Sequence, residues 1–145
     1  MNNLTAQIRT KDSKELLKSI GYKKTPARLS VLDLLKEYTK PLTIKEIMSK
    51  LDSRKIDQVT VYRILNIFKD AGIVRQIDFQ HGHAHFELKG GNDHHHIICA
   101  RCGKVEDLKC ELEELTKKIL KKSKNFSFIN DHNLELFGIC KKCKN

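Results

Sequence analysis

The sequence predicts an α+β fold, with an N-terminal winged helix-turn-helix domain over residues 1–89 and a small α/β domain over 90–145. Three observations predict this class. Four amphipathic helical segments fill the first 71 residues, an alternating strand pattern with a central turn follows over 73–88, and two Cys-x-x-Cys pairs lie beyond residue 98. The glycine-rich stretch 89–92 is the expected hinge between the domains.

Composition predicts a soluble protein, with 39% apolar and 32% charged residues. No apolar run approaches the length of a membrane span, and the N-terminus lacks the apolar core of a secretory signal. We therefore expect a cytoplasmic protein without a membrane partner. Residues 1–90 contain 17 Lys and Arg against 10 Asp and Glu, within a net charge of +10. This excess favours a polyanionic partner such as nucleic acid, and a merely basic surface is the alternative.

Three short helices are predicted first. A suitable N-cap precedes each of them, because Ser and Thr side chains accept hydrogen bonds from the free backbone N–H groups of a first turn. The expected helices are 14–20 after Ser13, 26–38 after Thr25, and 44–51 after Thr43. Thr43 and Glu46 also have the spacing of a capping box. Leu29, Leu32 and Leu35 form the apolar stripe of the second helix.

A fourth helix, from Asp57 as N-cap to about Ala71, has two contrasting faces. At about 100° per residue, the apolar face comprises Val61, Ile64, Leu65, Phe68 and Ala71. The opposite face comprises Tyr62, Arg63, Asn66, Lys69 and Asp70. An aromatic ring, a guanidinium and an amide are groups with which a helix reads bases and contacts phosphates. An ordinary solvated face is the alternative.

The pattern changes to strands after Gly72. Segments 73–79 and 83–88 predict a hairpin, with its turn at 80–82, that forms the wing. The second domain is expected to contain strands over 94–100, 126–129 and 134–139, a short strand after Gly103, and a helix over about 111–122. This helix is expected to bury Leu112, Leu115, Ile119 and Leu120.

The pairs Cys99-x-x-Cys102 and Cys140-x-x-Cys143 are the most informative motif. Two residues between cysteines let both thiolates of a pair reach one ion, and two pairs supply the four soft ligands of a structural Zn²⁺ site. One or two redox disulfides are the alternative. The sequence lacks the βαβ context of a redox motif, and a reducing cytosol favours metal thiolates.

Histidines form a second group of candidate ligands. Alternate residues of a strand point to one side, so His83, His85 and Glu87 share one face and His94 and His96 share another. Asp107 follows within a short strand. Imidazole and carboxylate suit Fe²⁺, Zn²⁺, Mn²⁺ or Ni²⁺, so this cluster is the expected exchangeable site. The alternative for each member is an ordinary surface side chain.

An enzymatic function is not expected. His85-x-Glu87 ahead of the first cysteine pair superficially resembles a zinc deaminase signature, but Ile98 stands where that signature has proline. The second cysteine pair has no role in that scheme. The sequence also lacks a helical H-E-x-x-H motif, a glycine-rich phosphate loop and a nucleophile elbow.

Taken together, these residues resemble the ferric uptake regulator (Fur) family of metal-dependent repressors, over about 16–143. The segments that carry the resemblance are Thr25-Pro26-Ala27-Arg28, Val59-Thr60-Val61-Tyr62-Arg63-Ile64-Leu65, Gly72-Ile73-Val74, His94-His95-His96-Ile97-Ile98-Cys99-x-x-Cys102-Gly103-Lys104 and Phe137-Gly138-Ile139-Cys140-x-x-Cys143. The resemblance implies a homodimer, in which the second domain mediates dimerisation. It also implies a transcriptional regulator of metal-homeostasis or stress genes that binds double-stranded operator DNA.

The resemblance also implies the roles of particular residues. The four paired cysteines would bind structural zinc. Tyr62 and Arg63 would contact DNA, and the remaining residues of the expected DNA-binding set are Arg28, Thr60 and Asn66. The regulatory site carried over by motif comprises Glu87, His94, His96 and Asp107. A further site would draw on His95, Glu114 and His132.

The chain departs from the family pattern in one ligand. Many members supply a histidine just before the third helix, but the corresponding stretch 38–43 contains none. We expect His83 or His85 to replace it in the regulatory site. Cys110, a fifth thiol without a pair, is expected to be a plain small side chain, with a reactive thiol as the alternative. A peroxide-sensing regulator of the same fold and a zinc-containing protein-interaction module are the alternative functions.

Overall fold

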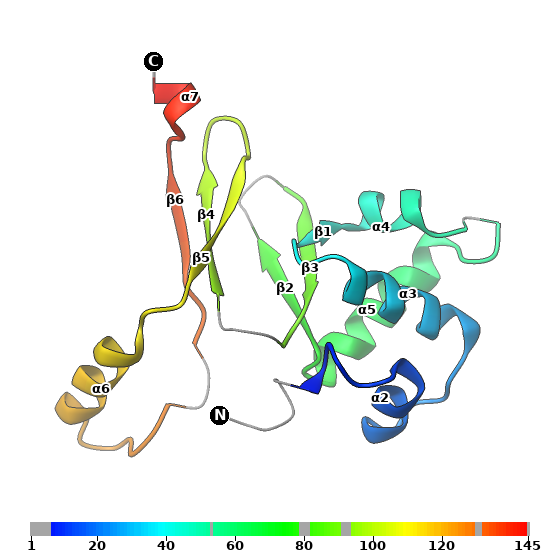
Figure 1. Ribbon diagram of the computed structural model, residues 1–145, viewed down its shortest axis with the longest axis horizontal. Helices are drawn as coiled ribbons and strands as arrows, with labels where there is room; N and C mark the ends of the chain where they lie inside the picture. The colour runs from blue at the N-terminus through cyan, green and yellow to red at the C-terminus, as the bar shows by residue number, and fades with distance from the viewer. Residues whose placement is uncertain (1–6, 53, 79–81, 91–93, 130–131, 145) are drawn as a thin grey trace. The chain divides into compact units, whose positions relative to one another are not determined.

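The structure is a computed structural model that describes residues 7–52, 54–78, 82–90, 94–129 and 132–144. The chain separates into two compact units, one within residues 2–91 and one within 92–145 (Figure 1). In the part of the chain that is described, no helix is long and apolar enough to cross a membrane.

Four helices whose bounds fall within the described residues precede the first hairpin. They are α2 (Ser13–Ser19), α3 (Pro26–Glu37), α4 (Ile44–Lys50) and α5 (Gln58–Asp70). Three predicted caps are confirmed. Thr25 accepts from the Arg28 N–H, Thr43 and Glu46 form the capping box, and Asp57 accepts from the Thr60 N–H. Each cap satisfies backbone donors that the helix itself leaves open.

The predicted cap of the first helix is wrong by one residue. Asp12 accepts hydrogen bonds from the backbone N–H groups of Lys14 and Glu15, so α2 begins at Ser13. The Ser13 side chain is instead buried and donates its hydroxyl to Asp33 on α3. Ser13 therefore makes a tertiary hydrogen bond in place of the N-cap hydrogen bonds that its position predicted.

A three-stranded sheet completes the first unit. Its strands are β1 (Leu42–Thr43), β2 (Val74–Asp78) and β3 (Ala84–Leu88). The order is β1-β3-β2 with antiparallel pairing, so β3 is central. The expected wing hairpin is present as β2 and β3, although part of its turn, 79–81, lies outside the described residues. Phe86 and Leu88 join the helices in one continuous core that includes Leu16, Leu32 and Phe68.

The second unit is a sheet with one long helix. Its elements are β4 (His94–Cys99), β5 (Val105–Lys109), α6 (Glu113–Lys122), β6 (Glu135–Gly138) and α7 (Lys141–Lys144). Strand β4 is central, paired antiparallel with β5 and parallel with β6 (Figure 1). Because β4 and β6 run parallel, their C-terminal ends lie at the same end of the sheet.

Two expectations for the second unit are corrected. Residues 126–129 are not a strand, because the Ser123 hydroxyl accepts from the backbone N–H groups of Asn125 and Phe126 and holds a local turn. The apolar side chains of the helix are not buried either. Leu115 is 50% exposed and Ile119 49% exposed, while Leu112 and Leu120 are half-buried. Among the described residues of the second unit, none covers these side chains of the helix.

Candidate metal centres and nucleic-acid interface

The four paired cysteines meet at one end of the second sheet. Cys99 ends β4, and its Cα partner on the parallel strand β6 is Gly138, so Cys140 follows at the same edge. Gly103, with a φ of +72°, turns the chain after the first pair and donates its N–H to the Cys99 carbonyl. The short helix α7 carries Cys143. All four sulfur atoms lie within 4.8 Å of one another.

The sulfur spacing fits a tetrahedral ion rather than a disulfide. Sγ of Cys102 and Sγ of Cys140 are 3.7 Å apart, and all the cysteines are free thiols. A disulfide requires about 2.05 Å. Two sulfur atoms bound to one zinc at about 2.3 Å lie about 3.8 Å apart at the tetrahedral angle. The donor set and its spacing therefore fit structural zinc.

The pKa values of the cluster show why it needs a cation. Hydrogen bonds from backbone N–H groups, first that of Cys140 at 3.3 Å, lower the pKa of the Cys99 thiol to about 6. Hydrogen bonding with the Cys140 side chain, the largest cause, raises the pKa of Cys143 to about 12. The sulfurs therefore cannot all ionise together without added positive charge, which a divalent metal supplies.

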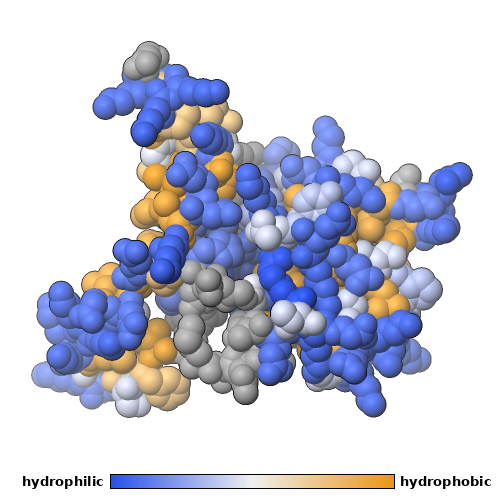
Figure 2. Space-filling model, viewed as in Figure 1, coloured by the Kyte–Doolittle hydropathy of each residue, from blue (hydrophilic) through white to orange (hydrophobic). Residues whose placement is uncertain are grey.

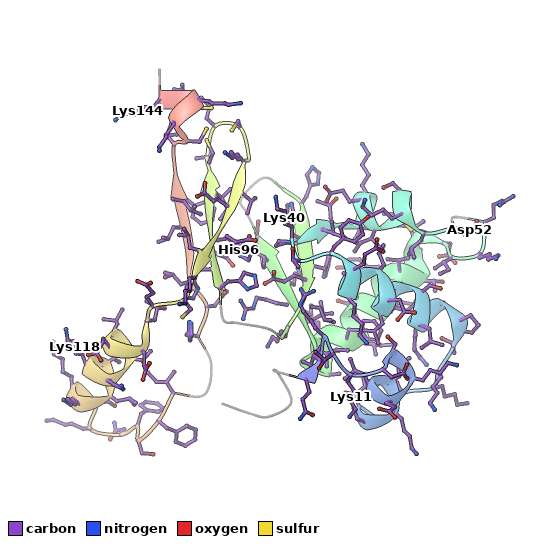
Figure 3. The ribbon with its side chains drawn as sticks, viewed as in Figure 1. Lys11, Lys40, Asp52, His96, Lys118 and Lys144 are labelled. Atoms are coloured by element: carbon purple, nitrogen blue, oxygen red, sulfur yellow. The ribbon has the colours of Figure 1, made fainter. Side chains whose placement is uncertain are left out.

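His94, His96 and Asp107 lie on one face of the second sheet. His94 and His96 alternate on β4, and their rings meet edge to face with centroids 5.0 Å apart. Asp107 is the Cα partner of His96 on β5, and its Oδ1 lies 3.7 Å from His96 Nε2. His96 is 1% exposed, and Figure 3 labels it on the central strand. The predicted grouping of these three residues is thus present within the second unit.

The first-unit members of the predicted regulatory set lie along β3. Glu87 is buried, and its Oε1 is 3.7 Å from Nη1 of Arg75, which faces it on β2. His85 is half-buried and its Nδ1 lies 3.1 Å from the His83 carbonyl. That contact favours the tautomer with hydrogen on Nδ1 and the lone pair on Nε2. His83 itself is exposed.

Two of the three residues expected in the further site lie together. His95 and His132 approach each other, with ring centroids 5.1 Å apart. The third group beside them is Cys110, whose Sγ lies 3.3 Å from His132 Nε2. Glu114 instead has an 80% exposed side chain, with Oε1 4.0 Å from Lys117 Nζ on α6. The sequence reading missed Cys110 because the signal, its place two residues after the strand partner of His95, depends on the register of β4 and β5.

The polar face of α5 is exposed as predicted. Tyr62 is 48% exposed, Arg63 is exposed and Asn66 is half-buried. Val61, Ile64, Leu65 and Phe68 are buried on the other face. The helix is therefore held by its apolar face while its aromatic, guanidinium and amide groups remain on or near the surface. Val59, 60% exposed, is an apolar neighbour that the sequence reading did not select.

Two residues of the expected DNA-binding set already have partners. The Thr60 hydroxyl donates to Asp57 at 2.8 Å, within the cap of α5. The Arg28 guanidinium lies 5.5 Å from the centroid of the Tyr22 ring and donates to the Lys23 carbonyl at 3.1 Å. Both groups are half-buried. Tyr62 and Arg63 are the more accessible members of the set.

Comparison with known proteins agrees with this arrangement. The model of the ferric uptake regulator family matches residues 19–137. The ferric uptake regulation protein of Legionella pneumophila is 35% identical over 136 residues, covering 92% of this chain and 99% of that protein. The Vibrio cholerae ferric uptake regulator structure is 35% identical with a TM-score of 0.74, covering 89% of this chain and 100% of that one.

A Pseudomonas aeruginosa ferric uptake regulator structure with manganese has 30% identity and a TM-score of 0.78, and covers 90% of this chain and 98% of that one. The match therefore extends across both units. With its winged helix-turn-helix and its four-cysteine cluster, this chain belongs to the ferric uptake regulator family of metal-responsive transcriptional regulators.

Proposed function

We propose that the protein is a homodimeric regulator, without catalytic activity, that binds double-stranded operator DNA in the cytoplasm more tightly when a regulatory metal is bound. One observation carries the proposal. The chain combines an exposed aromatic and cationic face on α5 with a second unit in which His94, His96 and Asp107 share a sheet face. The first feature suits DNA and the second suits a divalent metal.

Helix α5 is the proposed recognition helix. In helix-turn-helix proteins the N-terminal part of this helix contacts base edges in the major groove. Tyr62 and Arg63 lie in that part, and Arg63 can form paired hydrogen bonds with guanine. Val59, exposed one turn earlier, can pack against a thymine methyl group. Asn66, Thr60 and Arg28 are proposed as supporting contacts to DNA.

The proposed dimer is supported by apolar surface on the second unit. Exposed apolar side chains lie on α6, in the segment after it and on β6: Leu115, Ile119, Phe126, Phe128, Ile129, Leu136, Phe137 and Ile139. Figure 2 shows apolar surface at the underside of α6 and along β6. Phe126 and Phe128 are 72% and 70% exposed, which is unfavourable in water. A second copy of this unit is the proposed cover.

The proposed regulatory metal takes His94, His96 and Asp107 from the second unit and Glu87 from the first. A metal with ligands from both units favours the arrangements in which those ligands meet, and so shifts the distribution of interdomain angles. In a dimer these angles set the spacing of the two α5 helices, and thus their fit to two half-sites. A tenfold change in DNA affinity needs about 1.4 kcal/mol of coupling.

We propose His85, rather than His83, as the replacement for the missing histidine. The contact between its Nδ1 and the His83 carbonyl orients the ring and leaves Nε2 as the ligand atom, the usual arrangement around a metal-bound histidine. His85 also shares the strand face of Glu87. The His85→Ala variant should lose regulatory-metal affinity, whereas His83→Ala should keep it. Equal affinities of both variants and the wild type would contradict this choice.

The test is operator affinity measured by electrophoretic shift across Fe²⁺, Mn²⁺, Zn²⁺ and Ni²⁺, with structural zinc retained. One or more metals should raise affinity at least tenfold, and the double variant His94→Ala/His96→Ala should lose the response. Unchanged affinity in every metal would refute a metal-dependent regulator. If peroxide abolishes operator binding and adds oxygen mass to the 81–96 peptide of the iron form, the trigger is peroxide rather than metal supply.

A further inference from the structure

A third group of ligating side chains lies in the second unit, separate from the four-cysteine cluster. His95, Cys110 and His132 place one ligand atom each within 4.8 Å of the others. The Cys110 sulfur lies 3.3 Å from His132 Nε2, and the His95 and His132 rings are 5.1 Å apart. His95 is 5% exposed, and the other two residues are half-buried. All three belong to the same compact unit.

The fold of the sheet brings these residues together from three segments. His95 lies between His94 and His96 on β4, so its side chain points to the opposite face of the sheet from theirs. Leu108 is its Cα partner on β5, and Cys110 follows two residues later, just beyond the strand. His132 precedes β6, which pairs along the other edge of β4. The group is thus distinct from the proposed regulatory site on the other face.

The spacing fits one metal ion. A zinc ion bound at about 2.3 Å by sulfur and about 2.05 Å by nitrogen keeps these two atoms about 3.6 Å apart at the tetrahedral angle. The 3.3 Å between Cys110 Sγ and His132 Nε2 is close to that length. An ion pair between Cys110 and His132 alone would also explain this contact. Such a pair needs only one imidazole, whereas the structure places a second one, that of His95, beside it.

We propose that His95, Cys110 and His132 form a metal site of two imidazoles and one thiolate, with the fourth position open to water. The thiolate would take the ligand role that the family resemblance gives to Glu114, whose side chain is 80% exposed beside Lys117. Replacing a carboxylate oxygen by sulfur changes the preferred metal, because soft sulfur favours Zn²⁺ over Mn²⁺. The inference goes beyond the proposed function, since it requires neither operator binding nor the regulatory site.

Cobalt absorption spectroscopy tests the sulfur ligand directly. Full-length protein that retains zinc in its four-cysteine cluster, the tetrathiolate cluster, is titrated with Co²⁺. A zinc-sensitive dye confirms that no zinc is released. The regulatory site contains no sulfur, so a new sulfur-to-cobalt charge-transfer band reports only the Cys110 site. The wild type should show this band and Cys110→Ser should lose it. Absence of the band in the wild type, or its persistence in Cys110→Ser, would overturn the proposal.

Matched variants separate a ligand from a structural role. His95→Ala should change or abolish the band, whereas Glu114→Gln should leave it intact. Cys110→Ser should reduce zinc affinity at this site by more than the roughly tenfold that loss of a mere hydrogen-bond partner of a ligand costs, with an unchanged circular dichroism spectrum and unchanged dimer mass. Cobalt binding without a sulfur band in the wild type, lost in Glu114→Gln, would assign the site to the carboxylate instead. None of these readouts involves DNA, so they remain informative if the proposed operator binding fails.

Discussion

The two units of this chain differ in how they bury apolar side chains. The first unit has one continuous core formed by four helices and a sheet, with Leu16, Leu32, Leu35 and Phe68 almost fully buried. Among the described residues of the second unit, the buried apolar side chains are those of Ile98 and Cys99. The second unit instead concentrates metal-ligating groups in its sheet and leaves the apolar side chains of α6 and β6 exposed.

This difference indicates two ways of stabilising a small domain. The first unit is stabilised by apolar burial within one chain. The second has too small a core for that, so it is expected to depend on zinc and on a second copy. The predictions that follow test this division, from the largest expected effect to the smallest.

Loss of the tetrathiolate zinc should have the largest effect, confined to the second unit. Cys99→Ser removes the ligand at the end of β4, and a structural zinc contributes about 10 kcal/mol or more to the folding of a small domain. We expect the second unit to unfold while the first keeps its thermal transition, as followed by hydrogen exchange resolved along the chain. Glu114→Gln, at an 80% exposed side chain outside both groups of metal-ligating residues, is the control. A folded, zinc-free second unit in Cys99→Ser would contradict the division.

A cavity in the first unit should have the next largest effect. Phe68→Ala empties a fully buried position on α5 and should cost about 3–5 kcal/mol of unfolding free energy. Denaturant unfolding measures the loss, and zinc content should stay at the wild-type value. Val59→Ala, at a 60% exposed position before it on the same helix, is the matched control and should change stability little. Equal losses in both variants would mean that α5 is not held by this core.

Truncation on α6 should weaken the dimer without unfolding the first unit. Leu115 is 50% exposed in one chain. If a second copy covers it, Leu115→Ala should cost about 2–3 kcal/mol over both copies. Sedimentation analysis should show a dissociation constant raised by more than tenfold, while Lys118→Ala on the same helix should behave as the wild type. A dimer equally tight in Leu115→Ala would place the interface elsewhere.

The smallest effect is expected from a substitution on the exposed face of α5, which should leave both units and the dimer intact. Arg63→Ala should weaken operator binding by about 1–3 kcal/mol if the guanidinium contacts a base. Arg63→Lys, which keeps the charge but loses the paired donors, should restore little of the sequence specificity. Fluorescence anisotropy over a salt series distinguishes a base contact from a phosphate contact. Loss of a phosphate contact would mainly reduce the slope of affinity against salt concentration. Full operator affinity in Arg63→Ala would argue against α5 as the recognition helix.

Most of the first unit could be predicted from the sequence. The caps at Thr25, Thr43 and Asp57 depend on hydrogen bonds within three residues, and the two faces of α5 follow from helical periodicity. The prediction failed at Ser13, where a hydrogen bond to Asp33 across 20 residues outweighed the local capping role. Local signals therefore succeeded wherever no distant partner competed with them.

The second unit was harder to predict because its stabilising contacts are not local. The helix over 113–122 has apolar spacing typical of a buried face, but spacing does not reveal that Leu115 and Ile119 stay about half exposed within the described part of the second unit. Residues 126–129 combine large apolar side chains in a strand-like run, yet Ser123 holds their start in a turn. The partnership of Glu87 with Arg75 likewise depended on strand register.

The sequence by itself determined the N-caps at Thr25, Thr43 and Asp57, the two faces of α5 and the two Cys-x-x-Cys pairs, because each depends on residues only a few positions apart. Only the tertiary structure decided that Cys110 joins His95 and His132 while Glu114 points to solvent. Cys110 and His132 are 22 residues apart, and the pairing of β4 with both β5 and β6 brings them together. No periodicity in the chain encodes such a contact, because it depends on the register of three strands at once.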